Sequence, residues 1–200
     1  MNQETSNIEV FPATADRWDD LEKLFGPRGA YSGCWCMFWR LKRSEFNSLD
    51  GEGRKEILKN MTLRNEVPGV LAYSDGEPVG WCSIGPRAGF HPLENSRTLR
   101  RMDDVDLWSI VCFFVAKPYR KKGFMTALLR GAIRYAMEQG ARIVEAYPLD
   151  MHTPKLEGKN LTGYSGFMGI ASVFEAAGFI RVAEASETQV IMRYTISTTT

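Results

Sequence analysis

The chain has 200 residues, of which 44% are hydrophobic and 24% charged, a composition typical of a soluble globular domain that can bury a sizeable core. The 25 basic and 24 acidic residues leave a net charge of +1, which gives no reason to expect a nucleic-acid or membrane partner. No apolar run approaches the roughly 18 residues that span a bilayer, and the N-terminus shows no secretory signal. We expect one domain over residues 1–200, located in the cytoplasm.

The four cysteines are expected to be reduced thiols, because no secretory signal is visible. Cys34 and Cys36 are separated by one residue, a spacing that raises the question of a metal site. The sequence has only two histidines and no second closely spaced cysteine pair that would complete a zinc set. We therefore expect no metal and interpret the pair as buried apolar cysteines. Any role beyond packing stays open at this point.

The first half of the chain predicts two helices and three strands. A strand over residues 8–11 precedes a helix that Thr14 can cap. Residues 54–65 predict the second helix. Residues 70–73 and 79–84 predict two strands, which an Asp-Gly-Glu turn joins as a hairpin.

The second half of the chain alternates between strands and helices. A polar loop over residues 85–104 leads into residues 107–115, a nearly continuous apolar run typical of a strand buried on both faces. The apolar positions of residues 123–139 recur at helical spacing, and Gly140 ends that helix. The remaining predicted elements are a strand at 143–147, a helix at 170–177, and strands at 179–183 and 189–196.

The order of these elements predicts an α/β fold. The strand, helix and strand at its centre require a locally parallel pair, whereas the hairpins require antiparallel pairs. We therefore expect a mixed, mostly antiparallel sheet with one parallel strand pair and helices on both faces.

The turn between the buried strand and the long helix has the features of a phosphate site. The first amides of a helix lack internal partners and carry the positive end of the helix dipole. Gly123 would let the backbone approach a pyrophosphate closely, and Arg120, Lys121 and Lys122 add positive charge. The alternative is a solvated basic turn before an ordinary helix.

The acetyl-CoA motif of the GNAT superfamily of N-acetyltransferases, Q/R-x-x-G-x-G/A, is similar to residues 120–125 (Arg-Lys-Lys-Gly-Phe-Met). Residues 174–179 resemble the second signature of that family, a helix that ends in a Gly-Phe step into a strand. The resemblance covers residues 105–179. It departs from the motif at Met125, whose side chain we expect to point into the core.

The resemblance implies an enzyme that moves an acetyl group from acetyl-CoA to a primary amine, most simply that of a small molecule. In the family, the strand before the motif splays away from its parallel neighbour. Its edge then pairs with the pantetheine arm, and a backbone N–H polarises the thioester carbonyl. The residues thereby assigned to the cofactor are Phe113, Phe114, Val115, Arg120, Lys121, Lys122, Gly123, Phe124, Met125 and Thr126.

The family's usual proton-transfer residues are missing from this chain. Ser109 stands where some members place a glutamate base, and Phe174 stands where a tyrosine often protonates the departing thiolate. A serine of ordinary pKa is not a general base. We predict Tyr164 as the catalytic residue, with a water chain to a distant base as an alternative. Other polar candidates near strand ends, each with a structural role as its alternative, are Asp106, Glu145, Tyr147 and His152.

The acceptor site of the family is often built from the N-terminal helices and the loop between them. Here that region is rich in aromatic residues, and we predict Trp35, Trp39, Arg40 and Arg87 as substrate-binding residues. The alternative is that these rings pack the helices onto the sheet. Amino acids, polyamines, antibiotics and protein N-termini all stay open as acceptors.

Two further functions compete with acetyl transfer. One is a non-catalytic acyl-CoA-binding regulatory domain, which the missing acid and base leave open. The other is a metal or redox module centred on Cys34 and Cys36. The surplus of aromatic residues also admits a homodimer.

Overall fold

The computed structural model describes residues 8–161 and 166–197. The strands in this part of the chain form one seven-stranded sheet in the order β1-β2-β3-β4-β5-β7-β6. The strands are β1 (Ile8–Pro12), β2 (Gly69–Ser74), β3 (Glu77–Pro86), β4 (Trp108–Val115), β5 (Ile143–Ala146), β6 (Ile180–Ser186) and β7 (Gln189–Thr195).

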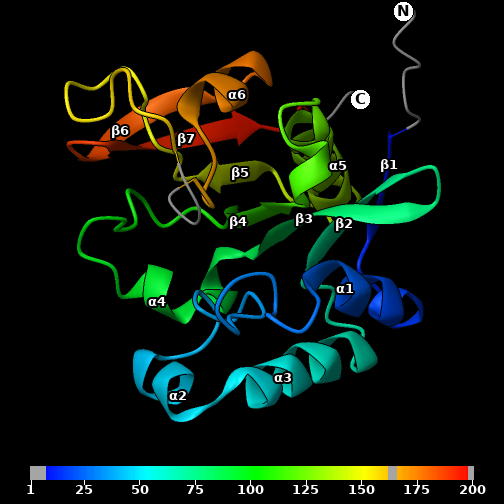
Figure 1. The fold of residues 1–200 in the computed structure, drawn as a ribbon. Helices are drawn as coiled ribbons and strands as arrows, with labels where there is room; N and C mark the ends of the chain where they lie inside the picture. The colour runs from blue at the N-terminus through cyan, green and yellow to red at the C-terminus, as the bar shows by residue number, and fades with distance from the viewer. Residues whose placement is uncertain (1–7, 162–165, 198–200) are drawn as a thin grey trace, which may run out of the picture.

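Helices cover both faces of the sheet (Figure 1): α5 and α6 lie on one face, and α1 to α4 lie on the other. None of the helices in the described residues is long and apolar enough to cross a membrane. The helices are α1 (Trp18–Phe25), α2 (Arg43–Ser48), α3 (Gly51–Leu63), α4 (His91–Glu94), α5 (Phe124–Glu138) and α6 (Ala171–Ala176), with short 3-10 turns η1 (Ala15–Arg17), η2 (Arg87–Gly89) and η3 (Lys117–Tyr119).

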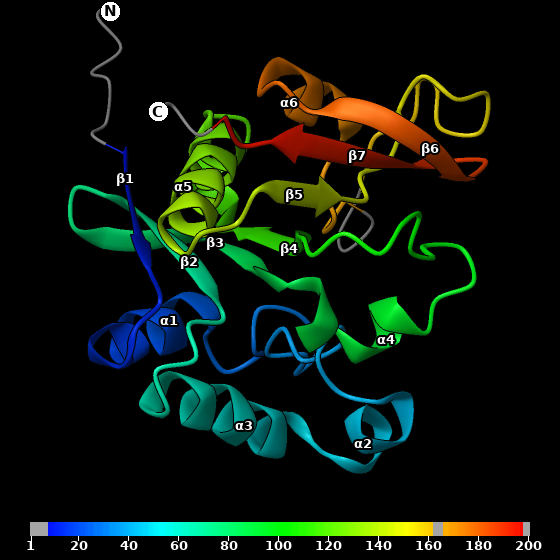
Figure 2. The ribbon, with the colours of Figure 1, turned by 180° about the vertical axis from the view of Figure 1, so that it is seen from behind.

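Strands β4 and β5 form the parallel pair that the sequence predicts, and the other neighbouring strands run antiparallel. Only the first three residues of β4 take part in the parallel pairing, from Trp108↔Val144 to Ile110↔Ala146. Beyond that point β5 ends while β4 continues to Val115, so the two strands diverge at their carboxyl ends (Figure 2). The predicted mixed sheet with a splayed parallel pair is confirmed.

Strand β4 contains a β-bulge at the start of this divergence. Ser83 of β3 pairs with Cys112, but the next residue, Ile84, pairs with Ile110, so Val111 is an extra residue. A bulge re-aims the side chains on either side of it. As a result Ile110 and Phe113 both face α5, although they are three residues apart, whereas Cys112 packs on the opposite face of the sheet.

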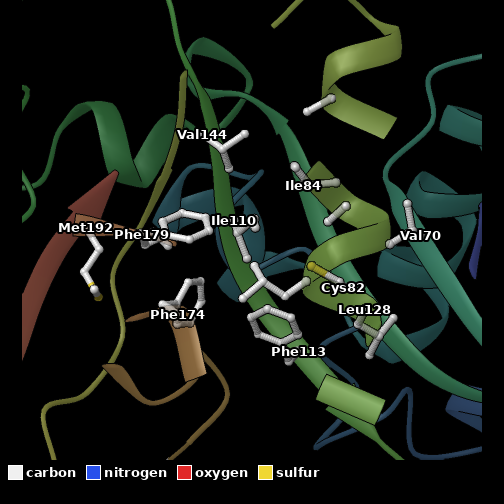
Figure 3. Close-up of a cluster of buried hydrophobic side chains, with 14 of the residues drawn as sticks. Val70, Cys82, Ile84, Ile110, Phe113, Leu128, Val144, Phe174, Phe179 and Met192 are labelled. Atoms are coloured by element: carbon white, nitrogen blue, oxygen red, sulfur yellow. The ribbon is translucent and has the colours of Figure 1, made fainter. Parts of the chain in front are cut away.

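The core between α5 and the sheet joins both halves of the chain (Figure 3). It extends from Val70 on β2 to Met192 on β7 through a group of aromatic rings on β4, α6 and the start of β6. Helix α5 also approaches β1 closely. A Cβ atom at Gly131 would lie 2.3 Å from Cγ1 of Val10, so only glycine allows this contact.

Helix α2 is an element that the sequence analysis missed, because its residues show no helical apolar periodicity. Hydrogen bonds at its two ends stabilise it instead. The carboxylate of Glu45 accepts from the backbone N–H of Lys42 at 2.9 Å. At the other end, Nη2 of Arg54 donates to the carbonyls of Phe46 and Leu49, each at 2.6 Å.

Candidate active site

The turn after β4 has the geometry that an anion site requires. Lys121 and Gly123 adopt left-handed conformations with φ of 61° and 83°, and α5 begins at the next residue, Phe124. No side chain of the described residues caps this helix. A Cβ atom placed on Gly123 would have no neighbour within 4 Å, so the space beside this glycine is open.

The side chains of the turn add positive charge around that space. Arg120, Lys121 and Lys122 are all exposed. Arg120 is positioned by its Nε, which donates to the carbonyl of Val115 at 2.9 Å, and Nζ of Lys122 lies 5.9 Å from the ring centroid of Tyr119. Open amides at the positive end of a 15-residue helix, with three cations beside them, fit a pyrophosphate. Met125 packs against the core, as expected.

The edge of β4 that faces the splay already has a hydrogen-bond partner. The N–H of Phe113 donates to the carbonyl of Phe167 at 2.6 Å. The segment that carries Phe167 also pairs with the chain after β5, because Leu149 donates to Gly169 and accepts from Ala171. The predicted pairing of a pantetheine arm with Phe113 therefore requires Phe167 to move. Phe114 and Val115 are half-buried next to this edge.

A buried polar network lies near the start of β4, on the face of the sheet opposite α5. Ser109, Glu145 and Arg193 occupy paired positions on β4, β5 and β7. The carboxylate of Glu145 accepts from Arg87, Arg193 and the hydroxyl of Tyr147, each at 2.7 Å. The hydroxyls of Ser109 and Tyr147 lie 2.9 Å apart. These side chains stabilise one another within the sheet.

Arg87 belongs to this network and not to an acceptor surface. Its side chain is fully buried, and its donors also bond the carboxylate of Glu94 and the carbonyls of Leu93 and Leu99. Burial raises the pKa of Tyr147 well above its ordinary value, which makes that phenol a poor proton donor at neutral pH. Glu145 on β5 and Tyr147 just after it therefore have structural roles in this geometry.

The positions of the family's usual acid and base are both buried. Ser109 and Phe174 are each 0% exposed, and Phe174 packs edge-on against the ring of Phe113. Tyr164, the predicted catalytic residue, lies outside the described residues. Neither Ser109 nor Phe174 therefore supplies a carboxylate or a phenol at these positions.

The predicted substrate-binding residues between α1 and α2 divide between the core and a more open region. Trp35 is buried and stacks on Trp18, with ring centroids 6.2 Å apart, so it has no surface for a substrate. Trp39 and Arg40 are only half-buried. Among the described residues, Nε1 of Trp39 and Nε of Arg40 are buried without a hydrogen-bond partner.

Arg40 is wedged between β3 and Phe90. Its Nη2 donates to the carbonyl of Pro68 at 2.7 Å and lies 3.4 Å from Oγ of Ser83. The guanidinium stacks 4.6 Å from the ring centroid of Phe90. Burial lowers the pKa of Arg40 to about 10, so the side chain keeps its charge at neutral pH.

A thiol cluster under the sheet is the feature that the sequence analysis did not find. The indole Nε1 of Trp81 donates to Sγ of Cys36 at 3.2 Å, and Cys112 packs against the hydrophobic cluster that contains Cys36 and Trp81. The only signal of this cluster in the sequence was the two-residue spacing of Trp81 and Ser83, which places both side chains on one face of their strand. No group of three or more potential metal ligands occurs among the described residues.

A cavity of about 450 Å³ lies at the other end of β4. Residues from the end of β3, the start of β4 and the end of α5 line it, among them Pro86, Trp108, Gln139 and Arg142. The turn that leads into α5 follows the opposite end of the same strand. This cavity is therefore separate from that turn.

The sequence of residues 35–153 matches the acetyltransferase (GNAT) family. The match covers more than half of the chain and includes β4, α5 and the turn between them. This protein belongs to the GNAT family of acetyltransferases. A comparison with curated protein sequences found no match.

Solved structures of the family share the fold at low sequence identity. The PaiA N-acetyltransferase from Thermoplasma acidophilum, in complex with coenzyme A, has a TM-score of 0.51 at 14% identity, over 95% of this chain and 99% of its own. YncA from Salmonella typhimurium, with acetyl-CoA, has a TM-score of 0.53 at 12% identity, over 95% of this chain and 94% of its own. The ribosomal-protein-alanine N-acetyltransferase from Brucella melitensis has a TM-score of 0.52 at 17% identity, over 94% of this chain and 99% of its own.

Proposed function

We propose that this protein transfers the acetyl group of acetyl-CoA to the primary amine of a small-molecule acceptor. The observation that carries the proposal is the uncapped start of α5, placed where β4 and β5 diverge and lined by three exposed cations. In a family whose structures bind coenzyme A and acetyl-CoA, this is the natural position for the pyrophosphate. The four cysteines are free thiols, in keeping with the cytoplasm as its compartment.

The donor end of the site would extend from the turn along β4. The amides of residues 121–126 and the cations at Arg120, Lys121 and Lys122 would hold the pyrophosphate. The N–H of Phe113, once released by Phe167, would donate to the thioester carbonyl and stabilise the charge that develops there. Phe114 and Val115 would flank the arm of the cofactor.

The acceptor end would lie beside Trp39 and Arg40. Both residues keep a buried donor without a partner among the described residues, and a buried donor that stays unpaired costs about 1 to 3 kcal/mol. An acceptor that offers an oxygen to these donors would remove that cost. This supports a polar amine that carries a carboxyl or hydroxyl group, such as an amino acid.

Thermal melting with coenzyme A and acetyl-CoA tests the cofactor assignment. A ligand at 100 times its Kd stabilises the native state by about 2.7 kcal/mol, so we expect a clear rise in melting temperature with either ligand. Adenosine without phosphates is the matched control and should shift the melting temperature little. No shift at saturating acetyl-CoA would refute the assignment.

Release of free thiol from acetyl-CoA then tests the transfer itself. Amino acids, polyamines, aminoglycoside antibiotics and short peptides are offered in turn, and we expect turnover with a small amine. Turnover only with peptides would refute a small-molecule acceptor. Tight binding of acetyl-CoA without turnover on any amine would favour the non-catalytic alternative, for which the burial of Ser109 and Phe174 is the specific observation.

A further inference from the structure

The cavity between the start of β4 and the end of α5 has no part in the proposed function. Its volume of about 450 Å³ is in the range of pockets that hold small molecules. The turn that leads into α5 follows the other end of β4. A molecule in the cavity would therefore be a second ligand, and its binding would not depend on the cofactor assignment.

The apolar part of the cavity is held in place by the neighbouring elements. The carbonyl of Leu107 accepts from the N–H of Arg87 at 2.9 Å, which ties the start of β4 to the end of β3. Trp108 is half-buried, and its ring packs edge-on against Tyr135 of α5, with centroids 5.8 Å apart. Val105, which also lines the cavity, is 44% exposed. The indole therefore offers a fixed, flat surface to the ring of a ligand.

Two of the three arginines that line the cavity are neutralised within the protein. Arg87 is 1% exposed, and its guanidinium pairs with two carboxylates. Nε of Arg101 donates to both carboxylate oxygens of Glu94, at 3.2 and 3.0 Å. The pKa of Arg101 is raised first by that hydrogen bond and also by the charge of Asp106, the acid of the cavity lining. Neither arginine thus offers an unpaired charge to a ligand.

Arg142 is the third arginine of the lining, and its charge is unpaired. The guanidinium is exposed and makes no hydrogen bond or ion pair with the described residues. The backbone beside it is fixed. The N–H of Ala141 donates to the carbonyl of Ala136 at the end of α5, and the carbonyl of Arg142 accepts from the N–H of Ile196, each at 2.9 Å. A cation on a rigid base therefore stands at the edge of an apolar cavity.

The cavity thus combines two features, neither of which would hold a ligand tightly alone. A guanidinium binds a carboxylate through two parallel hydrogen bonds, but an ion pair that stays exposed to water contributes little. A ligand whose body covers the indole of Trp108 would shield the ion pair from water and so strengthen it. An anion without an apolar body would gain only the exposed pair.

We propose that this cavity is a second ligand site and that it takes a small aromatic carboxylate. The carboxylate binds the guanidinium of Arg142, and the ring packs on the indole of Trp108 beside Leu107. The site selects against cationic ligands, because the unpaired arginine repels them. It selects against inorganic phosphate, because that anion leaves the apolar wall uncovered.

Fluorine NMR of trifluoromethyl-phenylacetate, with the corresponding amide as its uncharged analogue, tests the proposal. An efficient ligand of this size binds with a Kd of about 1 mM or below, and we expect such a value for the acid. The amide should bind about tenfold more weakly, because it forms no ion pair. Equal Kd values for the acid and the amide would refute a site that reads the carboxylate.

Arg142→Gln removes the charge and should raise the Kd of the acid about tenfold, to that of the amide. Because this side chain is exposed, the variant should fold like the wild type. Arg130→Gln is the matched control, since Arg130 is an exposed arginine of α5 that does not line the cavity, and it should keep the wild-type Kd. Trp108→Leu should weaken the acid and the amide alike. An unchanged Kd in Arg142→Gln, or an equal loss in Arg130→Gln, would overturn the proposal.

Competition with other anions locates the bound probe. The acid should keep its Kd when coenzyme A is present at saturation, whereas displacement by coenzyme A would place the probe at the cofactor turn and rule out a second site. Inorganic phosphate at the same concentration should not displace the acid. If it did, the cavity would be a simple anion site and the aromatic assignment would be wrong. Failure of coenzyme A to bind in thermal melting would refute the proposed function and leave the comparison of Arg142→Gln with Arg130→Gln intact.

Discussion

Gly123 and Gly140 occupy the two ends of α5 in the same backbone conformation. Their φ values are 83° and 82°, and a Cβ atom at either position would have no neighbour within 4 Å. Alanine at each should therefore cost about the same, roughly 1 kcal/mol of stability. The two positions differ in what lies in front of them, because the open amides and the cations are at Gly123 only.

We expect Gly123→Ala to weaken coenzyme A binding about tenfold or more, because the new methyl group stands where phosphate oxygens approach the backbone. Gly140→Ala should leave the Kd unchanged and so control for backbone strain. Calorimetric titration of both variants with coenzyme A measures the difference. Equal Kd values in the two variants would show that the pyrophosphate binds elsewhere.

Arg87 is the residue whose assigned role changes most between sequence and structure. All its donors are used inside the protein, and Glu145 beside it is 1% exposed. Loss of one partner of a buried ion pair leaves the other charge unpaired and costs about 3 to 5 kcal/mol. We expect Arg87→Met to lower the free energy of unfolding by that amount, as measured by denaturant titration.

Arg101→Met is the control for Arg87→Met. Arg101 pairs with the same carboxylate, Glu94, but is partly exposed, so its loss should cost less than about 1 kcal/mol. If Arg87 instead bound substrate, Arg87→Met would raise the KM of the acceptor while stability stayed near that of the wild type. That result would contradict the structural role.

At the scale of elements, the turn and bridge over residues 166–170 connect β4 to the chain that follows β5. Phe167 accepts from Phe113 of β4, and on the other side Leu149 pairs with Gly169 and Ala171. Ile170 forms a parallel bridge with Leu149. A pantetheine arm that pairs with β4 needs the same edge, so the two compete for the N–H of Phe113.

We expect coenzyme A to displace this segment and to change hydrogen exchange accordingly. The amide of Leu149 loses its acceptor, Gly169, and should exchange faster in the complex. Amides at the start of α5 should exchange more slowly because the phosphates accept from them. Exchange measured by mass spectrometry, with and without coenzyme A, tests both changes. Slower exchange at Leu149 would mean that the segment stays in place and the arm takes another path.

The elements were predictable where a local sequence pattern dominated. The Asp-Gly-Glu turn between β2 and β3, the apolar run of β4 and the 3.6-residue spacing of α5 each depend on neighbours in sequence, and the structure places these elements within two residues of the predicted bounds. Helix α2 was not predicted, because hydrogen bonds from Arg54, on another helix, stabilise its end.

The site was predictable only in its local part. The turn between β4 and α5 is a single stretch of chain, so its local sequence motif is enough to predict its backbone geometry. Three features of the structure join distant segments of the chain. They are the hydrogen bond from Trp81 to Cys36, the hydrogen bond from Phe113 to Phe167, and the burial of Arg87. Arg87 follows a strand as an exposed arginine would, and only the approach of Glu145 on β5 explains its burial.

The two halves of the sheet, β1 to β4 and β5 to β7, are joined by a narrow seam between β4 and β5, where only three residue pairs form. Two features strengthen that seam. On the α5 face, Phe174 of α6 contacts Phe113 of β4 and Phe179, with ring centroids 5.9 and 5.1 Å apart. On the other face, the ion pair of Arg87 and Glu145 is buried between β3 and β5. A continuous core of this kind favours one cooperative unit over two.

Two spectroscopic probes of unfolding test this unity, because all five tryptophans precede β5 in the sequence. Tryptophan fluorescence therefore reports the β1 to β4 half, whereas far-ultraviolet circular dichroism also reports α5 and α6. We expect the same denaturant midpoint from both probes. Phe174→Ala removes the ring at the seam and should cost about 3 to 5 kcal/mol. Because the half that contains α6 cannot unfold alone in a single cooperative unit, the variant should lower both midpoints equally. A shift of the dichroism midpoint alone would divide the chain into two units at the gap where the cofactor is expected to bind.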